Sequence, residues 1–135
     1  MSAAAPHQPP PQPQQSQSQP LVQYVVLRRD LLNQWPLGSV IAQGVHASVA
    51  AIWQSRTTPA TLQYCSDSQL ASMRTVVLQA DHEPALRHLA AQLARHHVLF
   101  TLWTEHPENF VTALATHPGL VPALKPHFSH LKLFR

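Results

Sequence analysis

Segments with strand-like and helix-like patterns alternate along most of this chain, and this alternation limits the fold more than any other feature of the sequence. Residues 21–27 (LVQYVVL) and 73–80 (MRTVVLQA) are rich in β-branched and other apolar side chains, a composition typical of buried strands. Two shorter segments of the same kind follow at 98–103 and 110–115. Helical patterns separate the first three of these segments, and such crossovers favour a partly parallel sheet covered by helices.

A short polar segment at 104–109 (TEHPEN) joins the last two predicted strands. A connection this short favours a neighbouring antiparallel pair, which makes the whole sheet mixed. We therefore expect an α/β fold, with a four-stranded mixed β-sheet flanked by helices on both faces in a single domain. Ligands of such sheets bind at the carboxyl ends of strands, beside helix N-termini. Here this rule indicates residues 28–30, the start of the first helix and residues 103–109.

The first twenty residues differ in composition from the rest of the chain. They contain six of the thirteen prolines, six glutamines and no charged side chain. Because such a segment buries too little apolar surface to offset the entropy of ordering, we expect residues 1–20 to form a disordered Pro/Gln-rich tail and residues 21–135 to form one domain. A protein partner that binds the tail as a polyproline helix is the alternative function of this segment.

Composition also excludes several classes of protein. No stretch approaches the ~18 consecutive apolar residues of a membrane span, and the N-terminus lacks the basic and apolar regions of a secretory signal. The single cysteine, Cys65, excludes an internal disulfide and makes the cytoplasm the expected location. The histidines are not spaced like metal ligands, since His96 and His97 are adjacent and no carboxylate lies near His127 and His130, so no metal site is expected.

The charged residues are distributed unevenly. Nine basic residues exceed six acidic ones, which gives a formal net charge of +3 with the histidines neutral. All the acidic residues lie between Asp30 and Glu108, whereas residues 109–135 carry only basic ones. A basic end favours a polyanionic partner such as nucleic acid, and an ordinary solvated surface is the alternative.

Residues 39–53 (SVIAQGVHASVAAIW) predict a helix with Ser39 as its N-cap, because alanines favour helix and serine favours the cap position. Gln43 follows Ser39 by four residues and His46 follows Gln43 by three, so the three side chains share one helical face. His46 on this otherwise apolar helix is either a buried histidine with satisfied hydrogen bonds or a general base at a hydrolytic site.

Five strings occur along the chain in this order: YVVLRRDL, WPLGSVIAQGVHASVAA, MRTVVLQA, WTEHPENF and HLKLF. Together they resemble the type 2 peptidyl-tRNA hydrolase family, and most of all its eukaryotic branch of peptidyl-tRNA hydrolase domain-containing proteins. The resemblance covers essentially all of residues 21–135, and its most specific parts are AQxxHA at 42–47 and WxExPEN at 103–109. It implies a four-stranded mixed sheet, no metal or organic cofactor, and cleavage of the ester between a peptide and the 3′ end of tRNA.

The resemblance also implies candidate site residues. Gln43 and His46 match the family's helix, and Asp30 matches the aspartate that follows its first strand. Glu105 stands where the family has an aspartate. Two departures accompany these matches: Ser39 stands at the last lysine of the family's GKGK loop, and the Gly-Arg-Thr part of the family's run after the third strand is absent.

The hypothesis that follows is a peptidyl-tRNA hydrolase whose partner is tRNA or peptidyl-tRNA. In it His46 and Glu105 orient the attacking water, and Gln43 and Asn109 donate hydrogen bonds to the substrate carbonyl or the terminal ribose. Asp30 completes the catalytic set, and four basic residues contact the tRNA phosphates: Arg28, Arg29, Lys125 and Lys132. The competing hypothesis is a catalytically inactive member of the fold that binds RNA or acts as an adaptor, because the family's lysine is missing.

Overall fold

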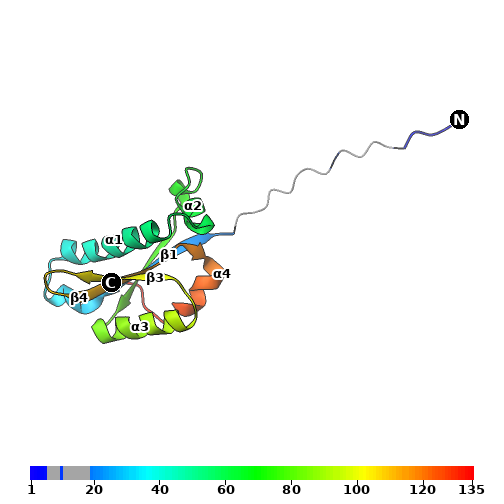
Figure 1. Ribbon diagram of the computed structural model, residues 1–135. Coiled ribbons are helices and arrows are strands. Elements are labelled where there is room, and N and C mark those ends of the chain that lie inside the picture. The colour runs from blue at the N-terminus through cyan, green and yellow to red at the C-terminus, as the bar shows by residue number, and fades with distance from the viewer. Residues whose placement is uncertain (6–9, 11–18) are drawn as a thin grey trace.

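Figure 1 shows the computed structural model, which describes residues 1–5, 10 and 19–135. The predicted tail and its protein partner fall mainly on residues 6–9 and 11–18, which lie outside the described residues. From residue 21 onward the elements follow the predicted alternation: β1 (Leu21–Arg28), α1 (Leu37–Gln54), α2 (Pro59–Tyr64), β2 (Thr75–Ala80), α3 (Glu83–Arg95), β3 (Phe100–Glu105), β4 (Phe110–Thr116), β5 (Gly119–Leu120) and α4 (Val121–Leu124). Short 3-10 turns occur at Arg29–Asn33, Leu70–Ser72 and Lys125–His127.

A mixed sheet forms the middle layer of the molecule, with its main strands in the order β2-β1-β4-β3. β1 runs parallel to β2, and the segment that holds α1 and α2 makes the crossover between them. β4 runs antiparallel to both of its neighbours, β1 and β3. The predicted α/β fold with a mixed sheet is confirmed, and the two-residue strand β5 adds a short antiparallel pairing at the start of β1.

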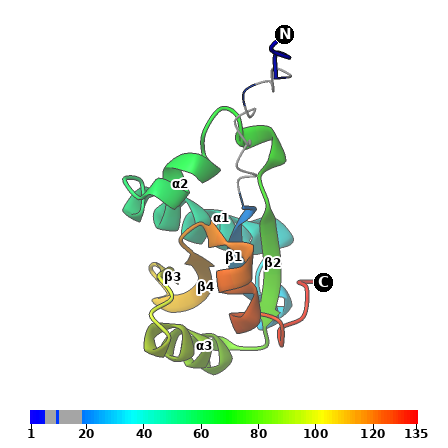
Figure 2. The ribbon, with the colours of Figure 1, turned by 90° about the vertical axis from the view of Figure 1, so that its right-hand side faces the viewer.

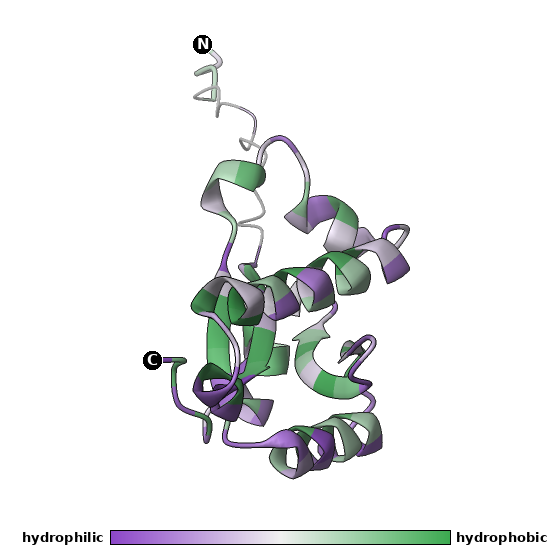
Figure 3. Cartoon of the chain, turned by 90° about the vertical axis from the view of Figure 1, so that its left-hand side faces the viewer, coloured by the Kyte–Doolittle hydropathy of each residue, from purple (hydrophilic) through white to green (hydrophobic). Residues whose placement is uncertain are grey.

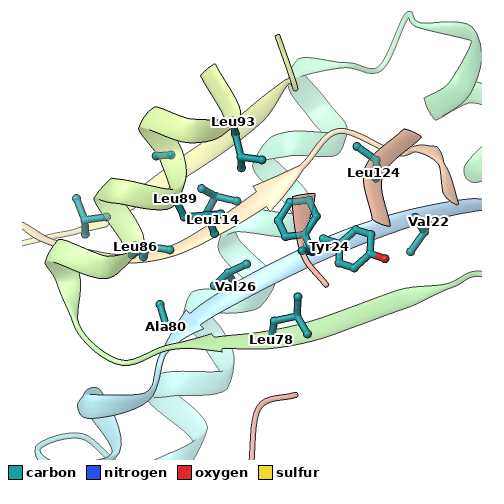
Figure 4. Packing of buried hydrophobic residues seen from close by; sticks show 13 residues of the cluster. Val22, Tyr24, Val26, Leu78, Ala80, Leu86, Leu89, Leu93, Leu114 and Leu124 are labelled. Carbon is teal, nitrogen blue, oxygen red and sulfur yellow. The ribbon is translucent and has the colours of Figure 1, made fainter. Parts of the chain in front are cut away.

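Helices cover both faces of this sheet, with α1 on one face and α3 on the other (Figure 1 and Figure 2). Successive side chains of a strand point to opposite faces, so β1 contributes to two cores. Val25 and Leu27 pack on the α1 side against small residues: Ala47, Ala51, Ala113 and Ala115. Tyr24 and Val26 belong to the larger cluster on the α3 side (Figure 4).

α3 contributes four of the thirteen buried residues of the larger cluster. An i, i+3, i+4, i+7 spacing puts four residues on the buried face of this helix: Leu86, Leu89, Ala90 and Leu93. At the other side of the cluster, Phe128 stacks on Tyr24 with ring centroids 4.4 Å apart. Burying a leucine or phenylalanine side chain stabilises a fold by ~1.5–3 kcal/mol, so the α3 side carries most of the hydrophobic stabilisation.

The start of α1 differs from the prediction, and α3 begins with a histidine cap. α1 begins at Leu37 after Pro36, so Ser39 lies within the first turn and its side chain does not cap the helix. Pro36 occupies the N-cap position with a φ of −57° and a ψ of 148°, and no side chain caps the first turn of this helix. α3 is capped by His82, whose Nδ1 accepts a hydrogen bond from a backbone N–H of the first turn at 3.1 Å.

The hydropathy of the chain follows its layers. The strands are predominantly hydrophobic, whereas several connecting loops are hydrophilic (Figure 3). β1 lies between β2 and β4, and seven of its eight residues are buried. None of the helices in the described part of the chain combines the length and the apolar character needed to cross a bilayer.

Candidate active site

A polar cluster lies where the first turns of α1 approach β3 and β4. Gln43 is its centre, because only 3% of this residue is exposed and its side-chain amide is fully hydrogen-bonded. The amide nitrogen donates to the backbone carbonyl of Ser39 at 3.2 Å and to Oε2 of Glu105 at 2.5 Å. Oε1 of Gln43 accepts a hydrogen bond from Oγ1 of Thr112 at 2.7 Å. Since a carboxylate only accepts hydrogen bonds, the Gln43 amide must turn its nitrogen toward Glu105.

Glu105 is the last residue of β3, where it pairs with Phe110 of β4. The predicted strand ended two residues earlier, and the extension carries this carboxylate to the end of the hairpin. Oε1 of Glu105 accepts the backbone N–H of His106 at 3.3 Å. The ion pairs found among the described residues do not include Glu105. This carboxylate therefore keeps lone pairs that can accept a hydrogen bond from a water or a hydroxyl group.

His46 lies on the same side of α1 as Gln43, one turn further along the helix. It is exposed, and its imidazole stacks on the indole of Trp103 with centroids 5.0 Å apart and 30° between the planes. Nε1 of Trp103 is buried and has no hydrogen-bond partner among the described residues. The first interpretation of His46, a buried core histidine, is wrong. Its imidazole lies on the flat ring of Trp103 from β3 and stays exposed.

These side chains surround one open pocket of about 350 Å³. Its walls bring together three of the predicted catalytic residues, Gln43, His46 and Glu105, and add the position of the missing lysine, Ser39. The remaining residues of the wall come from the loop before α1, from α1 itself and from the β3–β4 turn: Trp35, Pro36, Ala42, His106 and Glu108. The pocket thus lies at the carboxyl end of a strand and the N-terminus of a helix, where ligands of α/β folds bind.

Asn109 and Asp30 are not among the residues that line this pocket. Asn109 is an exposed turn residue with a φ of 59°, a left-handed conformation that asparagine tolerates better than most residues. Asp30 is held by the Arg28 guanidinium, with Nε–Oδ1 and Nη2–Oδ2 distances of 3.1 and 2.9 Å. The structure therefore gives Asn109 a role in the turn and Asp30 a role in binding Arg28.

Arg28 was predicted to contact phosphates, but its side chain is only 9% exposed. In addition to Asp30, it binds the backbone carbonyl of Val111 through Nη1 at 3.1 Å, and it lies 3.7 Å from the Glu83 carboxylate. Glu83 in turn accepts the backbone N–H of Val111 at 3.0 Å. Arg28 therefore joins β1, β4 and α3 inside the molecule, and its hydrogen-bonding capacity is used there.

The other predicted phosphate contacts lie at the surface. Arg29 and Lys132 line an open hollow of about 540 Å³ together with Arg135, which the sequence prediction missed. Nε of Arg29 donates to the backbone carbonyl of Arg135, and its guanidinium lies 6.0 Å from the Phe134 ring. Lys125 is exposed at the end of α4 and is not part of the hollow. Two of the four predicted residues are thus grouped by the fold.

Comparison with known proteins identifies the family. The sequence profile of the family described as "Peptidyl-tRNA hydrolase PTH2" matches residues 21–134. The chain belongs to the PTH2 family. Two curated relatives, both named "Putative peptidyl-tRNA hydrolase PTRHD1", are similar to it. The mouse (Mus musculus) protein is 39% identical over 118 residues, which cover 85% of this chain and 83% of the relative. The human (Homo sapiens) protein is 37% identical over 123 residues, which cover 89% and 86%.

Two residues of this candidate site were missed by reasoning from the sequence. Thr112 is one of two threonines in the otherwise apolar strand β4, and a hydroxyl in such a strand is only a weak signal of a polar partner on the helix above it. Trp103 opens the WxExPEN string, and its place two residues before Glu105 puts both side chains on the same face of β3. Thr112 sets the orientation of Gln43, and Trp103 provides the surface on which His46 lies.

Proposed function

We propose that this PTH2 family member hydrolyses the ester bond between tRNA and an N-blocked aminoacyl or peptidyl group. The family match and the names of the two relatives support a hydrolase of this class. The observation that carries the proposal is the contact between Gln43 and Glu105, in which a buried amide of fixed orientation holds a carboxylate at the wall of a pocket that His46 also lines. A carboxylate and an imidazole that face one space can hold and deprotonate a water.

In the proposed reaction, a water donates hydrogen bonds to Glu105 and to His46. Its oxygen attacks the ester carbonyl carbon while one proton passes to the imidazole, which forms a tetrahedral intermediate. The oxyanion lies near the first turn of α1, where the positive end of the helix dipole stabilises it. The bond to the ribose oxygen then breaks and the imidazolium gives its proton to that oxygen, so the products are a free tRNA hydroxyl and a peptide carboxylic acid. The acid then ionises to the carboxylate by releasing the second proton of the water to solvent.

The site lacks the lysine that the family would place at Ser39. Among the described residues that line the pocket, His46 and His106 are the ones that can carry a positive charge. The proposal therefore assigns stabilisation of the oxyanion to the helix dipole and to these imidazoles. Because removing one preorganised donor costs ~10²–10³ in rate, the expected activity is lower than that of a site with the lysine.

The proposal is tested by measuring the release of free tRNA from N-acetyl-aminoacyl-tRNA. The wild-type protein is expected to release tRNA when enzyme is in excess over substrate. Glu105→Gln and His46→Ala are each expected to lower the rate ~10²-fold or more, because each removes a group that holds or deprotonates the water. If the wild-type protein releases no tRNA under these conditions, the proposal is wrong and the protein acts without catalysis.

Matched controls separate loss of the site from general damage. Asp67→Asn removes an exposed carboxylate from the loop after α2, and His88→Ala removes an exposed imidazole from α3 on the other face of the sheet. Both variants are expected to keep the wild-type rate. Activity that survives both Glu105→Gln and His46→Ala would contradict the assignment of the site and leave the hydrolase activity itself standing.

A further inference from the structure

One large aromatic side chain lines the pocket and has no part in the proposed chemistry. Trp35 lies in the connection between β1 and α1, and it lines the pocket together with Glu105 and His46. The other two tryptophans of the chain have different surroundings, because Trp103 is stacked against the His46 imidazole and Trp53 lies near the far end of α1. Trp35 is therefore the tryptophan whose role at this site needs an explanation.

The indole of Trp35 is held by contacts within the protein. It stacks with the Phe110 ring, with centroids 6.3 Å apart and 18° between the planes. The Phe110 ring lies 5.8 Å from the guanidinium of the buried Arg28. The backbone N–H of Trp35 donates to the carbonyl of Leu31 at 2.8 Å. Because the half-buried indole is already fixed, it loses little further freedom when a ligand stacks on it.

The charge of the pocket determines which part of a nucleotide it can hold. Its described lining includes the carboxylates of Glu105 and Glu108 and contains no lysine or arginine. Because two negative groups repel a third, this lining disfavours a phosphate. A nucleobase is flat and neutral, and it stacks on an aromatic side chain whatever its sequence. The pocket therefore suits the base of a nucleotide better than its phosphate.

We propose that Trp35 is the surface on which the terminal base of the tRNA 3′ end stacks, while the ester on its ribose lies at Glu105 and His46. This assignment rests on the proposed function, because it takes the tRNA ester as the substrate. The base and the ester belong to one nucleotide, so the group that binds the base must adjoin the reacting groups, as Trp35 does in this pocket. Every tRNA ends in the same adenosine, whereas the peptide varies, so a fixed ring suits the base better than the peptide side chains.

The topology of the sheet supports this placement. β1 and β3 both run antiparallel to β4, so their carboxyl ends lie at the same edge of the sheet. The connection that leaves β1 at this edge begins with Arg29, which lines the hollow with Lys132, and reaches the pocket at Trp35. One edge of the sheet therefore carries cations for backbone phosphates and an aromatic ring for the last base. Proteins that bind single-stranded nucleic acid combine these two features.

The test compares the binding of two RNA hairpins that copy a tRNA acceptor stem and end in a free 3′ hydroxyl, so that no hydrolysis is needed. One hairpin ends in adenosine, and the other carries an abasic ribose as its last nucleotide. The wild-type protein is expected to bind the complete hairpin about 5- to 100-fold more tightly, the range that stacking of one base supplies. Trp35→Leu is expected to remove this preference, and Trp35→Phe is expected to retain part of it.

Two controls separate loss of stacking from general damage. Affinity for the abasic hairpin is expected to stay unchanged in Trp35→Leu, which also shows that this variant is folded. Trp53→Leu removes a tryptophan that is 65% exposed and lies outside the pocket, so it should keep the full preference. A wild-type protein that binds both hairpins equally, or a preference that survives Trp35→Leu, would overturn the proposal. An equal loss of affinity for the two hairpins in Trp35→Leu would also overturn it.

The hydrolysis assay gives a second, separate measurement. Stacking of the base is the same in the substrate and in the transition state, so Trp35→Leu is expected to raise KM about tenfold with little change in kcat. A fall in kcat with an unchanged KM would contradict the role of Trp35 in binding. A wild-type protein that prefers the complete hairpin through Trp35 and yet releases no tRNA would support base stacking and contradict the proposed hydrolase activity.

Discussion

Arg28 and Arg29 are neighbours in the sequence and have opposite surroundings in the fold. Arg28 ends β1 and turns into the molecule, where Asp30 and Val111 occupy its guanidinium. Arg29 begins the following 3-10 turn and faces the basic hollow with Lys132. Two adjacent cations therefore differ in function: the first is part of the internal hydrogen-bond network, and the second is available to a phosphate.

The hydroxyl of Thr112 is expected to affect activity through Gln43. Thr112→Val removes the hydrogen bond to Oε1 of Gln43 and leaves a buried acceptor without a donor, which costs about 1–3 kcal/mol of stability. The released amide can rotate away from Glu105, so the rate of tRNA release is expected to fall about tenfold. Urea unfolding and the hydrolysis assay measure the two effects.

Thr101→Val is the control for this prediction. Thr101 is 8% exposed and donates to Gln54 at the other end of α1, so its loss is expected to leave the pocket unchanged. It is expected to cost less stability than Thr112→Val, because Gln54 is exposed and its freed oxygen can bind water. Only Thr112→Val should lower the rate in folded protein. Equal rates for the two valine variants would show that the orientation of Gln43 does not matter to the reaction.

At the scale of elements, the approach of α1 to the sheet depends on small residues. Ala47, Ala51, Ala113 and Ala115 lie between this helix and the strands below it. A Cβ added at Gly44 would lie 3.4 Å from side-chain atoms of both Val25 and Leu27. α1 is therefore close enough for the Gln43 amide to reach Glu105 and Thr112, which larger residues at this interface would prevent.

Small and large substitutions at Gly44 are expected to change the free energy of unfolding in opposite directions. Gly44→Ala adds a methyl at ordinary contact distance and removes a helix-interior glycine, so it is expected to raise stability by up to ~1 kcal/mol. Gly44→Leu overpacks the interface and is expected to lower stability by about 1–3 kcal/mol. Thermal unfolding measures both. Gly38→Leu is the control, since no atom lies within 4 Å of a Cβ at Gly38, and a loss there as large as at Gly44 would contradict the packing argument.

At the scale of the whole molecule, the net charge of +3 is small, and its placement matters more than its size. The fold brings Arg29 and Lys132 to one hollow, to which Arg135 also contributes. A group of cations on one surface is the arrangement that binds a nucleic acid backbone. The proposed tRNA surface is therefore this hollow, without the buried Arg28.

The salt dependence of tRNA binding is expected to identify these cations. The double variant Arg29→Ala/Lys132→Ala is expected to weaken binding and to reduce the slope of log affinity against log salt by about 1.4–1.8, because each lost phosphate contact lowers it by ~0.7–0.9. Arg95→Ala, which removes an exposed cation at the end of α3, is the control and should leave the slope unchanged. A filter-binding titration in which all three proteins have one slope would contradict the assignment of the hollow.

The sequence by itself determined the order of the main elements, and it placed the ends of the four main strands and of α1 to within about two residues. Apolar residues repeat every two residues in a strand and about every 3.6 residues in a helix, and both repeats involve only residues close together in the chain. The strands and the buried face of α3 could therefore be predicted from the sequence. The same local geometry put Ser39, Gln43 and His46 on one side of a helix, and ordered strings of residues identified the family.

Only the tertiary structure decided which candidates meet. Gln43 binds Glu105 and Thr112, which lie 62 and 69 residues further along the chain. The same packing left Asn109 and Asp30 outside the pocket and enclosed Arg28 between three elements. The physical reason is that the burial and the hydrogen-bond partners of a side chain depend on segments that are distant in the chain. Local sequence patterns do not show which distant segments pack around it.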